Sequence, residues 1–173
     1  MTGSIDDPAP PRTTLVEPDW SREHKRRLQW YPSRALLRAI RDYQAASGPF
    51  ARLKRRFASE RHRFWSIITG ADIPIGSRIG GGLMMPHPSG IVISPWAVIG
   101  PNCLLFQQVT IGNTGKGAPT LGAHVDVGAG AKIIGPVTVG DHARIGANAV
   151  VTSDIPAGAT AVGIPARVIS RVD

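Results

Sequence analysis

One histidine stands in a part of the sequence that otherwise holds apolar, glycine and turn-forming residues. His87 lies between two prolines in the run LMMPHPSGIVI, which covers residues 83–93. Imidazole is the side chain best suited to take and return a proton near neutral pH. His87 is therefore a candidate general base, and the alternative is a histidine that only occupies a turn.

Three other residues have side chains that could act in catalysis or metal binding, but a structural role explains each of them more simply. Cys103 is the only cysteine, and its place at a small position of a recurring pattern predicts a packed core thiol and not a nucleophile. His124 and His142 are 18 residues apart, and stacked histidines of this kind can bind zinc. Because no third ligand stands in register with them, we expect two surface histidines and no metal site.

The second half of the sequence repeats every six residues. Six residues turn an α-helix through about 600°, which moves successive members to different faces, whereas six is a multiple of the strand's period of two. The next residue is often glycine, which suits a bend with positive φ or a close backbone approach. The repeat therefore predicts a mainly β fold in which short strands stack into a parallel β-helix. Its aliphatic members are Ile93, Ile99, Leu105, Ile111, Leu121, Val127, Ile133, Val139, Ile145 and Val151.

The repeat is interrupted at two places. Met85 and Ile93 are eight residues apart, and Ile111 and Leu121 are ten apart. Extra residues must leave the wall of a solenoid as loops, and loops on a rigid scaffold commonly carry function. The first interruption contains His87 and the second contains the run NTGKGAPT.

The residues before the repeat differ in composition. Residues 1–19 hold four prolines and no periodic apolar pattern, which predicts a disordered tail. Residues 20–68 are predicted to be a basic helical region with two helices, one from Pro32 to Gly48-Pro49 and one from about Pro49 to Ile68. The β-helix is expected over residues 69–169, and residues 170–173 are expected to form a C-terminal tail.

The net charge of +8 is concentrated in the helical region. Residues 21–63 hold 13 Lys and Arg against three acidic residues, so the other 130 residues carry about −2 by difference. We expect the apolar stripe of the second helix to pack on the end of the β-helix and its basic residues to be solvated. A nucleic-acid or anionic-membrane module is the rival interpretation, and such contacts through residues 21–63 are not expected. The stripe consists of Phe50, Leu53, Phe57, Phe64 and Ile68.

Three features bear on the compartment. A single cysteine excludes an internal disulfide, and no apolar segment approaches the length of a membrane span. The first residues also lack the apolar core of a signal peptide. We therefore expect a cytoplasmic protein.

At this point the sequence resembles the hexapeptide-repeat acyltransferases and, within them, the serine acetyltransferases. The similar stretch covers roughly residues 69–169, and its most specific parts are PHPSGIVI and VTIGNTGKG. The resemblance implies a left-handed parallel β-helix, acetyl-CoA as acyl donor, and a homotrimer with active sites in the clefts between neighbouring subunits. A solenoid that forms trimers and does no chemistry is a further alternative.

The resemblance also implies roles for individual residues. His87 matches the general base, and Asp72 in GADIP matches the carboxylate that orients it. The turn formed by Gly112, Asn113, Thr114 and Gly115 matches the glycine-rich turn near the thioester, where backbone amides would bind the oxyanion. The segments matched to the coenzyme A cleft supply Gly128, Ala129, Gly130, Ala131, Lys132 and Arg167.

The sequence departs from the family pattern where the acceptor would bind. Pro86 stands where an acidic residue usually precedes the base, and the second loop lacks the usual Arg-His pair. Because these groups hold the ionic ends of an amino acid, the acceptor is L-serine by family resemblance, with a sugar or exopolysaccharide hydroxyl as the alternative. The chain ends in RVD and not in isoleucine, so no cysteine synthase complex is expected.

Overall fold

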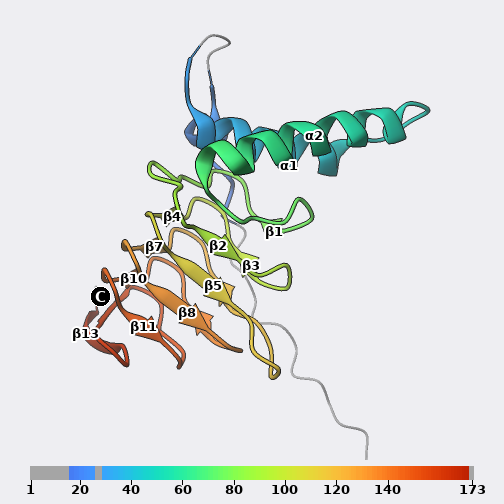
Figure 1. Cartoon of the computed structure of the whole chain (residues 1–173). Coiled ribbons are helices and arrows are strands. Elements are labelled where there is room, and N and C mark those ends of the chain that lie inside the picture. The colour runs from blue at the N-terminus through green and yellow to red at the C-terminus, as the bar shows by residue number, and fades with distance from the viewer. Residues whose placement is uncertain (1–15, 26–28, 172–173) are drawn as a thin grey trace, which may run out of the picture.

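The computed structural model describes residues 16–25 and 29–171, which form a helical hairpin followed by a β-helix (Figure 1). A 3-10 helix η1 (Trp20–Glu23) precedes α1 (Pro32–Ala45) and α2 (Ala51–Thr69). Pro32 occupies the first turn of α1, and Gly70 ends α2 with a φ of 63°, a left-handed conformation that favours glycine. Both helices lie where the sequence predicts them.

The β-helix has three parallel walls. The first contains β1, β3, β6 and β9, the second β4, β7, β10 and β12, and the third β2, β5, β8 and β11, while β13 pairs antiparallel with β12. The strands of the first wall are Arg78–Ile79, Val98–Ile99, Thr120–Leu121 and Thr138–Val139. Those of the second wall are Leu104–Leu105, Asp126–Val127, Arg144–Ile145 and Ala159–Val162, and β13 beside them is Arg167–Arg171. Those of the third wall are Val92–Ile93, Thr110–Gly112, Lys132–Ile134 and Val150–Val151.

The repeat determines what points inward. In the ten strands from β2 to β11, the repeated aliphatic residue is buried and stacks on its counterpart in the next coil, as Ile111 stacks on Ile133. Successive uninterrupted coils are 18 residues apart, as with the pairs Val92 and Thr110, and Lys132 and Val150. The predicted parallel β-helix and mainly β fold class are therefore confirmed.

The repeated glycines serve close packing more than positive φ. A β-carbon at Gly100 would lie 2.4 Å from the carbonyl oxygen of Gly122 in the next coil. The left-handed turn conformations instead fall on other residues, among them Asn102, His124 and His142. The imidazoles of His124 and His142 stack with 4.7 Å between ring centroids, which confirms the expected stack.

The helical hairpin covers one end of the β-helix (Figure 1). Leu36, Leu37 and Ile40 of α1 are buried in the same core cluster as the first coil. Arg41 fastens α1 in place, because its guanidinium donates to the carbonyl oxygens of Ile79 at 2.6 Å and Gly80 at 2.7 Å and pairs with Glu23 at 2.9 Å.

The apolar stripe of α2 does not pack on the β-helix, which corrects the prediction. Its five members are between 45% and 68% exposed. The reason is that α1 already fills the end of the β-helix, so α2 packs against α1 and the first coil through another face. That face includes Ala58, which is buried, and His62, which hydrogen-bonds the carbonyl oxygen of Ile73 at 2.7 Å.

Most of the predicted N-terminal tail, residues 1–15, and part of the predicted C-terminal tail, residues 172–173, lie outside the described residues. Residues 16–19 belong to the ordered chain, because the Asn102 side chain accepts from the Asp19 amide at 2.7 Å and donates to the Glu17 carbonyl at 3.0 Å. At the other end, β13 continues through Arg171. No helix in the described ranges is long and apolar enough to cross a membrane.

We predict that Gly100→Ala lowers the free energy of unfolding by roughly 1–3 kcal/mol, because the new methyl group meets backbone that cannot move aside. Gly76→Ala is the matched control, since a β-carbon there meets nothing within 4 Å, and it should change stability by no more than about 0.5 kcal/mol. Urea denaturation of both variants measures the difference. Equal effects would contradict the close-packing role of Gly100.

We predict that Cys103 is unreactive while the protein is folded. It is buried, and burial raises the pKa of its thiol to about 12, so almost no thiolate exists at pH 8. An aromatic disulfide reagent should titrate no thiol in buffer and one per chain in denaturant, with Cys103→Ala as the blank. Because the unfolded thiol loses its proton near pH 9.0, this contribution to stability is complete below that pH and declines as the pH rises toward 12. Rapid reaction of the folded protein at pH 8 would contradict the burial.

Candidate active site

His87 lies on the turn that joins the second wall to the third in the first coil. We call the edge formed by such turns edge A; it contains residues 86–90, 106–109, 128–131 and 146–149. Backbone hydrogen bonds link its successive coils, from Gln108 to Ser89, from Gly130 to Gln107, and from Asn148 to Ala129, at 2.8–2.9 Å. His87 is exposed, so its imidazole is available to a ligand.

His87 lines a pocket of about 460 Å³ between the β-helix and the helical hairpin. Pro86, Pro88 and Ser89 of the same turn contribute one side. The other side comes from the residues that lead into α1 and from the end of α2, namely Trp30, Tyr31, Pro32, Ser33, Ile68 and Thr69. The helical hairpin is therefore part of the site and does more than close the β-helix.

The sequence analysis did not identify the helical side of this pocket. Trp30 is 70% exposed, and its indole packs edge-on against Trp65 of α2 with 5.6 Å between ring centroids. The only available signal was the adjacent aromatic pair Trp30-Tyr31 before the proline that begins α1. That pair alone does not show which part of the β-helix it will face.

Asp72 lies beside the His87 turn, but its carboxylate does not contact the imidazole. Its backbone forms a parallel bridge with Val92, and Gly90 at the end of the turn donates to the carbonyl oxygen of Gly70 at 2.9 Å. Both side chains are exposed, and among the described residues no hydrogen bond joins them. The pairing of Asp72 with His87 stays a prediction.

The structure does not bring the turn of Gly112, Asn113, Thr114 and Gly115 to the His87 edge. This turn follows β5 and joins the third wall to the first, at the opposite border of the third wall, which we call edge B. Thr114 and Gly117 exchange backbone hydrogen bonds of 2.8 and 3.1 Å, and the Thr114 hydroxyl accepts from the Lys116 amide. In the described chain this leaves the amides of Asn113 and Gly115 as the unengaged donors of the turn.

The segment Gly128, Ala129, Gly130, Ala131 and Lys132 does lie on edge A, two coils below His87. The Lys132 ammonium donates to the carbonyl oxygen of Gln108 at 2.5 Å, which holds it on this edge. The Ala131 side chain is fully buried inside the β-helix, so a ligand on this edge would meet its backbone, and its place in the coenzyme A segment stays a prediction. The two glycines also have a packing reason, since β-carbons there would lie 2.6 and 2.1 Å from the next coil.

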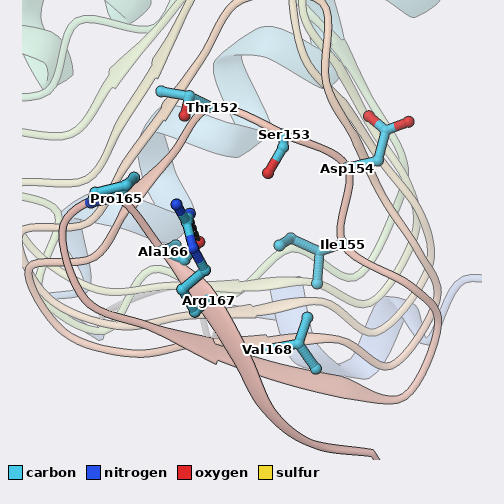
Figure 2. Close-up of a pocket in the computed structure, with 8 residues that line it drawn as sticks. All are labelled: Thr152, Ser153, Asp154, Ile155, Pro165, Ala166, Arg167 and Val168. Atoms are coloured by element: carbon cyan, nitrogen blue, oxygen red, sulfur yellow. Dashed lines mark hydrogen bonds between the residues drawn. The ribbon is translucent and has the colours of Figure 1, made fainter.

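Arg167 lies at the far end of the same edge, at the start of β13. It lines a second pocket of about 470 Å³ with Thr152, Ser153, Asp154 and Val168 (Figure 2). Its guanidinium donates to the carbonyl oxygen of Ala166 at 2.9 Å, and Asp154 stands on another side of the pocket. Arg167 is exposed and free to meet an anionic group.

His87 thus stands at the first coil of an edge that carries Lys132 two coils away. Arg167 lines the pocket at the last coil, and the turn 152–154 of edge B forms another side of that pocket. Adjacent strands in a wall are about 4.8 Å apart, so the four steps from Asp72 to Val150 span about 19 Å. A base at one end of a long track and cations along it suit a reaction on an extended anionic substrate. In the ranges the structure describes, no group of three or more His, Cys, Asp or Glu residues is placed to hold a metal ion.

Comparison with known proteins connects this arrangement to a family. Residues 118–153 match the bacterial transferase hexapeptide family, a model of six repeats. Serine acetyltransferase from Synechococcus elongatus is 47% identical over 109 residues, which cover 61% of this chain and 45% of that protein. Serine acetyltransferase from Helicobacter pylori is 47% identical over 125 residues, which cover 68% of this chain and 73% of that protein. The chain therefore spans about half of the first relative and about three quarters of the second.

Solved structures agree with the sequence relatives. Soybean serine acetyltransferase complexed with serine superposes with a TM-score of 0.68 at 35% identity, covering 80% of this chain and 58% of that one. A serine acetyltransferase in complex with CoA gives 0.68 at 33% identity, covering 81% and 57%. Superposition over four fifths of the chain requires the same hand of winding, which confirms the left-handed β-helix. The repeat, the fold and these relatives together show that this chain belongs to the serine acetyltransferase family of hexapeptide-repeat transferases.

Proposed function

We propose that the protein is an acyltransferase that moves the acetyl group of acetyl-CoA to the hydroxyl of L-serine in the cytoplasm, with His87 as general base. The observation that carries the proposal is the placement of His87 in a pocket at the first coil of edge A, on the same edge as Lys132, while Arg167 lines a separate pocket at the end of the β-helix. The pantetheine arm would follow edge A, and the two cations would meet coenzyme A phosphates.

Acetyl transfer from a thioester to a hydroxyl requires a general base and hydrogen-bond donors for the oxyanion. A serine hydroxyl is a weak nucleophile, and it attacks the thioester carbonyl as the His87 imidazole takes its proton. The tetrahedral intermediate then expels the thiolate of coenzyme A, which receives the proton back from the imidazolium. Donors that fit the oxyanion lower the barrier most when they are fixed before the reaction.

Asp72 is proposed to orient this imidazole. A carboxylate on one ring nitrogen sets the tautomer and stabilises the imidazolium, and the backbone bridge to Val92 holds Asp72 next to the His87 turn. Hydrogen bonds of this kind often form fully only when substrate is bound. An uncharged amide at position 72 would fill the same space without this function.

The oxyanion donors are proposed to come from a neighbouring subunit. The turn of Gly112–Gly115 lies at edge B, across the third wall from His87 in the same chain. In a trimer of parallel β-helices, edge B of one subunit would face edge A of the next and bring Asn113 and Gly115 toward His87.

A sugar hydroxyl is the second candidate acceptor, and the pocket lining favours it. None of the ten residues that line the pocket is Asp, Glu, Lys or Arg. A free amino acid needs ionic partners for its ammonium and carboxylate, whereas a sugar needs hydroxyl partners and a flat apolar surface such as Trp30. With serine as acceptor, the ionic partners must come from the neighbouring subunit.

We predict that His87→Ala lowers kcat by roughly 10²–10⁴, the usual contribution of a general base. Release of the coenzyme A thiol is measured with L-serine and, separately, with nucleotide-linked sugars as acceptors. His142→Ala is the matched control, because it removes an exposed imidazole from another edge of the same β-helix and should leave kcat unchanged. A His87→Ala enzyme with near wild-type kcat would remove His87 from the mechanism, and activity with sugars alone would replace serine as the acceptor.

We predict that two inactive variants restore activity when they assemble together. His87→Ala removes the base, and Gly115→Pro removes an amide donor from the turn at edge B. If each site uses the base of one subunit and the turn of the next, coexpressed chains should recover about a quarter of the wild-type sites. Chains expressed separately and mixed without subunit exchange are the control. No recovery in verified mixed trimers would show that each site lies within one chain.

A further inference from the structure

The exposed face of α2 is an apolar surface that the other residues described by the structure do not cover. It consists of the predicted stripe together with Ile67, and we call it the α2 face. Its aliphatic members Leu53 and Ile67 are 66% and 81% exposed, and Phe57 is 66% exposed. A run of large apolar side chains along 19 residues of helix is far more than scattered surface residues, and such a surface marks an interaction site.

Cations border this surface on both sides. At about 100° per residue, Arg52, Arg56 and Arg63 fall along one side of the α2 face, while Lys54 and Arg61 fall along the other. Arg61 pairs with Asp42 at 2.7 Å. Glu60, the one acid of α2, falls between Leu53 and Ile67 at the same spacing, and its carboxylate lies 3.8 Å from the Arg63 guanidinium. Arg52, Lys54 and Arg56 are exposed and form none of the ion pairs of the described residues.

The other described residues leave this surface exposed. The face of α2 that contains Ala58 and His62 packs against α1 and the first coil, and the α2 face points away from it. Figure 1 shows the loop between α1 and α2 extending beyond the β-helix, so the beginning of α2 overhangs the solenoid.

The sequence-based expectation that residues 21–63 make no membrane contact rests on the stripe packing on the β-helix, and the stripe is exposed instead. We therefore propose that the α2 face binds the surface of a membrane rich in anionic lipids. A helix with aromatic and aliphatic residues on one face and Lys and Arg along its borders lies in the lipid interface, its apolar residues among the acyl chains and its cations at the phosphates. The excess of cations on α2 attracts a negatively charged surface and repels a positive one.

The charges favour lipid over a second copy of this chain. A symmetric pair of α2 faces would bring the same cations of both copies together, with one Glu60 from each to offset them. Nucleic acid would engage the cations but would leave Leu53, Ile67 and Phe57 exposed to water. A lipid surface satisfies both the apolar and the charged parts.

The position of the α2 face relative to the pocket adds a reason. Ile68, at the end of the stripe, lines the His87 pocket together with Trp30. A protein bound through the α2 face would therefore hold the rim of that pocket near the lipid surface. Membrane binding itself does not depend on which acceptor the enzyme uses, so it is tested separately from catalysis.

The test is cosedimentation of the full chain with vesicles. One set contains equal amounts of phosphatidylglycerol and phosphatidylcholine, and the other contains phosphatidylcholine alone. We expect binding to the anionic vesicles that is lost in 0.5 M NaCl and little binding to the neutral ones. The variant Arg52→Gln/Lys54→Gln/Arg56→Gln should bind about 100-fold more weakly, since each cation near an anionic surface contributes close to a factor of five.

Two further variants separate the explanations. Leu53→Gln/Ile67→Gln keeps the charge and should also lose binding, because the apolar contact is gone. Arg144→Gln removes one cation from an exposed position on β10, far from α2, and should bind as wild type does. All variants alter exposed side chains, and circular dichroism checks that each is folded.

Three results would overturn the proposal. Wild type that stays in solution with anionic vesicles contradicts it, and so does equal loss of binding in Arg144→Gln, which would indicate a general charge effect. A change of oligomer mass in Leu53→Gln/Ile67→Gln, with no vesicle binding by wild type, would assign the α2 face to contact between copies.

Discussion

Every other feature of this protein depends on the stacking of each coil on the next through identical positions. An aliphatic residue every six positions supplies three inward side chains per coil, and 18 residues return the chain to the same wall. Burial of these side chains stabilises the coil only if each strand keeps its register, because a slip of one residue would turn the aliphatic side chains outward. The backbone must also come close at each bend, which excludes side chains at positions such as Gly100 and Gly122.

This constraint explains where the functional segments lie. A wall cannot accept extra residues without losing register. The extra residues of both interruptions therefore form loops at the edges, and the strand register is restored after each loop. His87 lies in the loop at edge A and the glycine-rich turn lies at edge B, so the third wall separates them within one chain. The two segments can therefore form one active site only if neighbouring subunits place edge A against edge B.

The sequence predicts the β-helix well because its signal is repeated ten times and has one physical cause, burial of every sixth residue. Other features depend on contacts that no local pattern records. The periodicity of α2 indicates an apolar face, but it does not show that Leu36, Leu37 and Ile40 of α1 cover the end of the β-helix first. Likewise, Ala131 belongs to a segment that the family resemblance assigns to binding, yet its position in the repeat places its side chain inside the β-helix. The Trp30 side of the pocket arises from packing of the helical hairpin, which is a long-range contact.

The helical hairpin has three roles in this account. It covers the hydrophobic end of the β-helix, it contributes Trp30 and Ile68 to the pocket, and it presents the α2 face to the surroundings. The electrostatic division of the chain follows the same boundary, since residues 21–63 carry the positive charge and the β-helix is nearly neutral. One short segment therefore forms one side of the His87 pocket and carries most of the positive charge of the chain.

The most direct test of the central claim is a crystal structure of the assembled protein with coenzyme A bound. The account predicts that the pantetheine arm follows edge A of one subunit, with its sulfur beside the His87 imidazole and within reach of the Gly115 amide of the neighbouring subunit. A sulfur bound at either of the other two edges, or a His87 imidazole that faces no bound ligand, would contradict it.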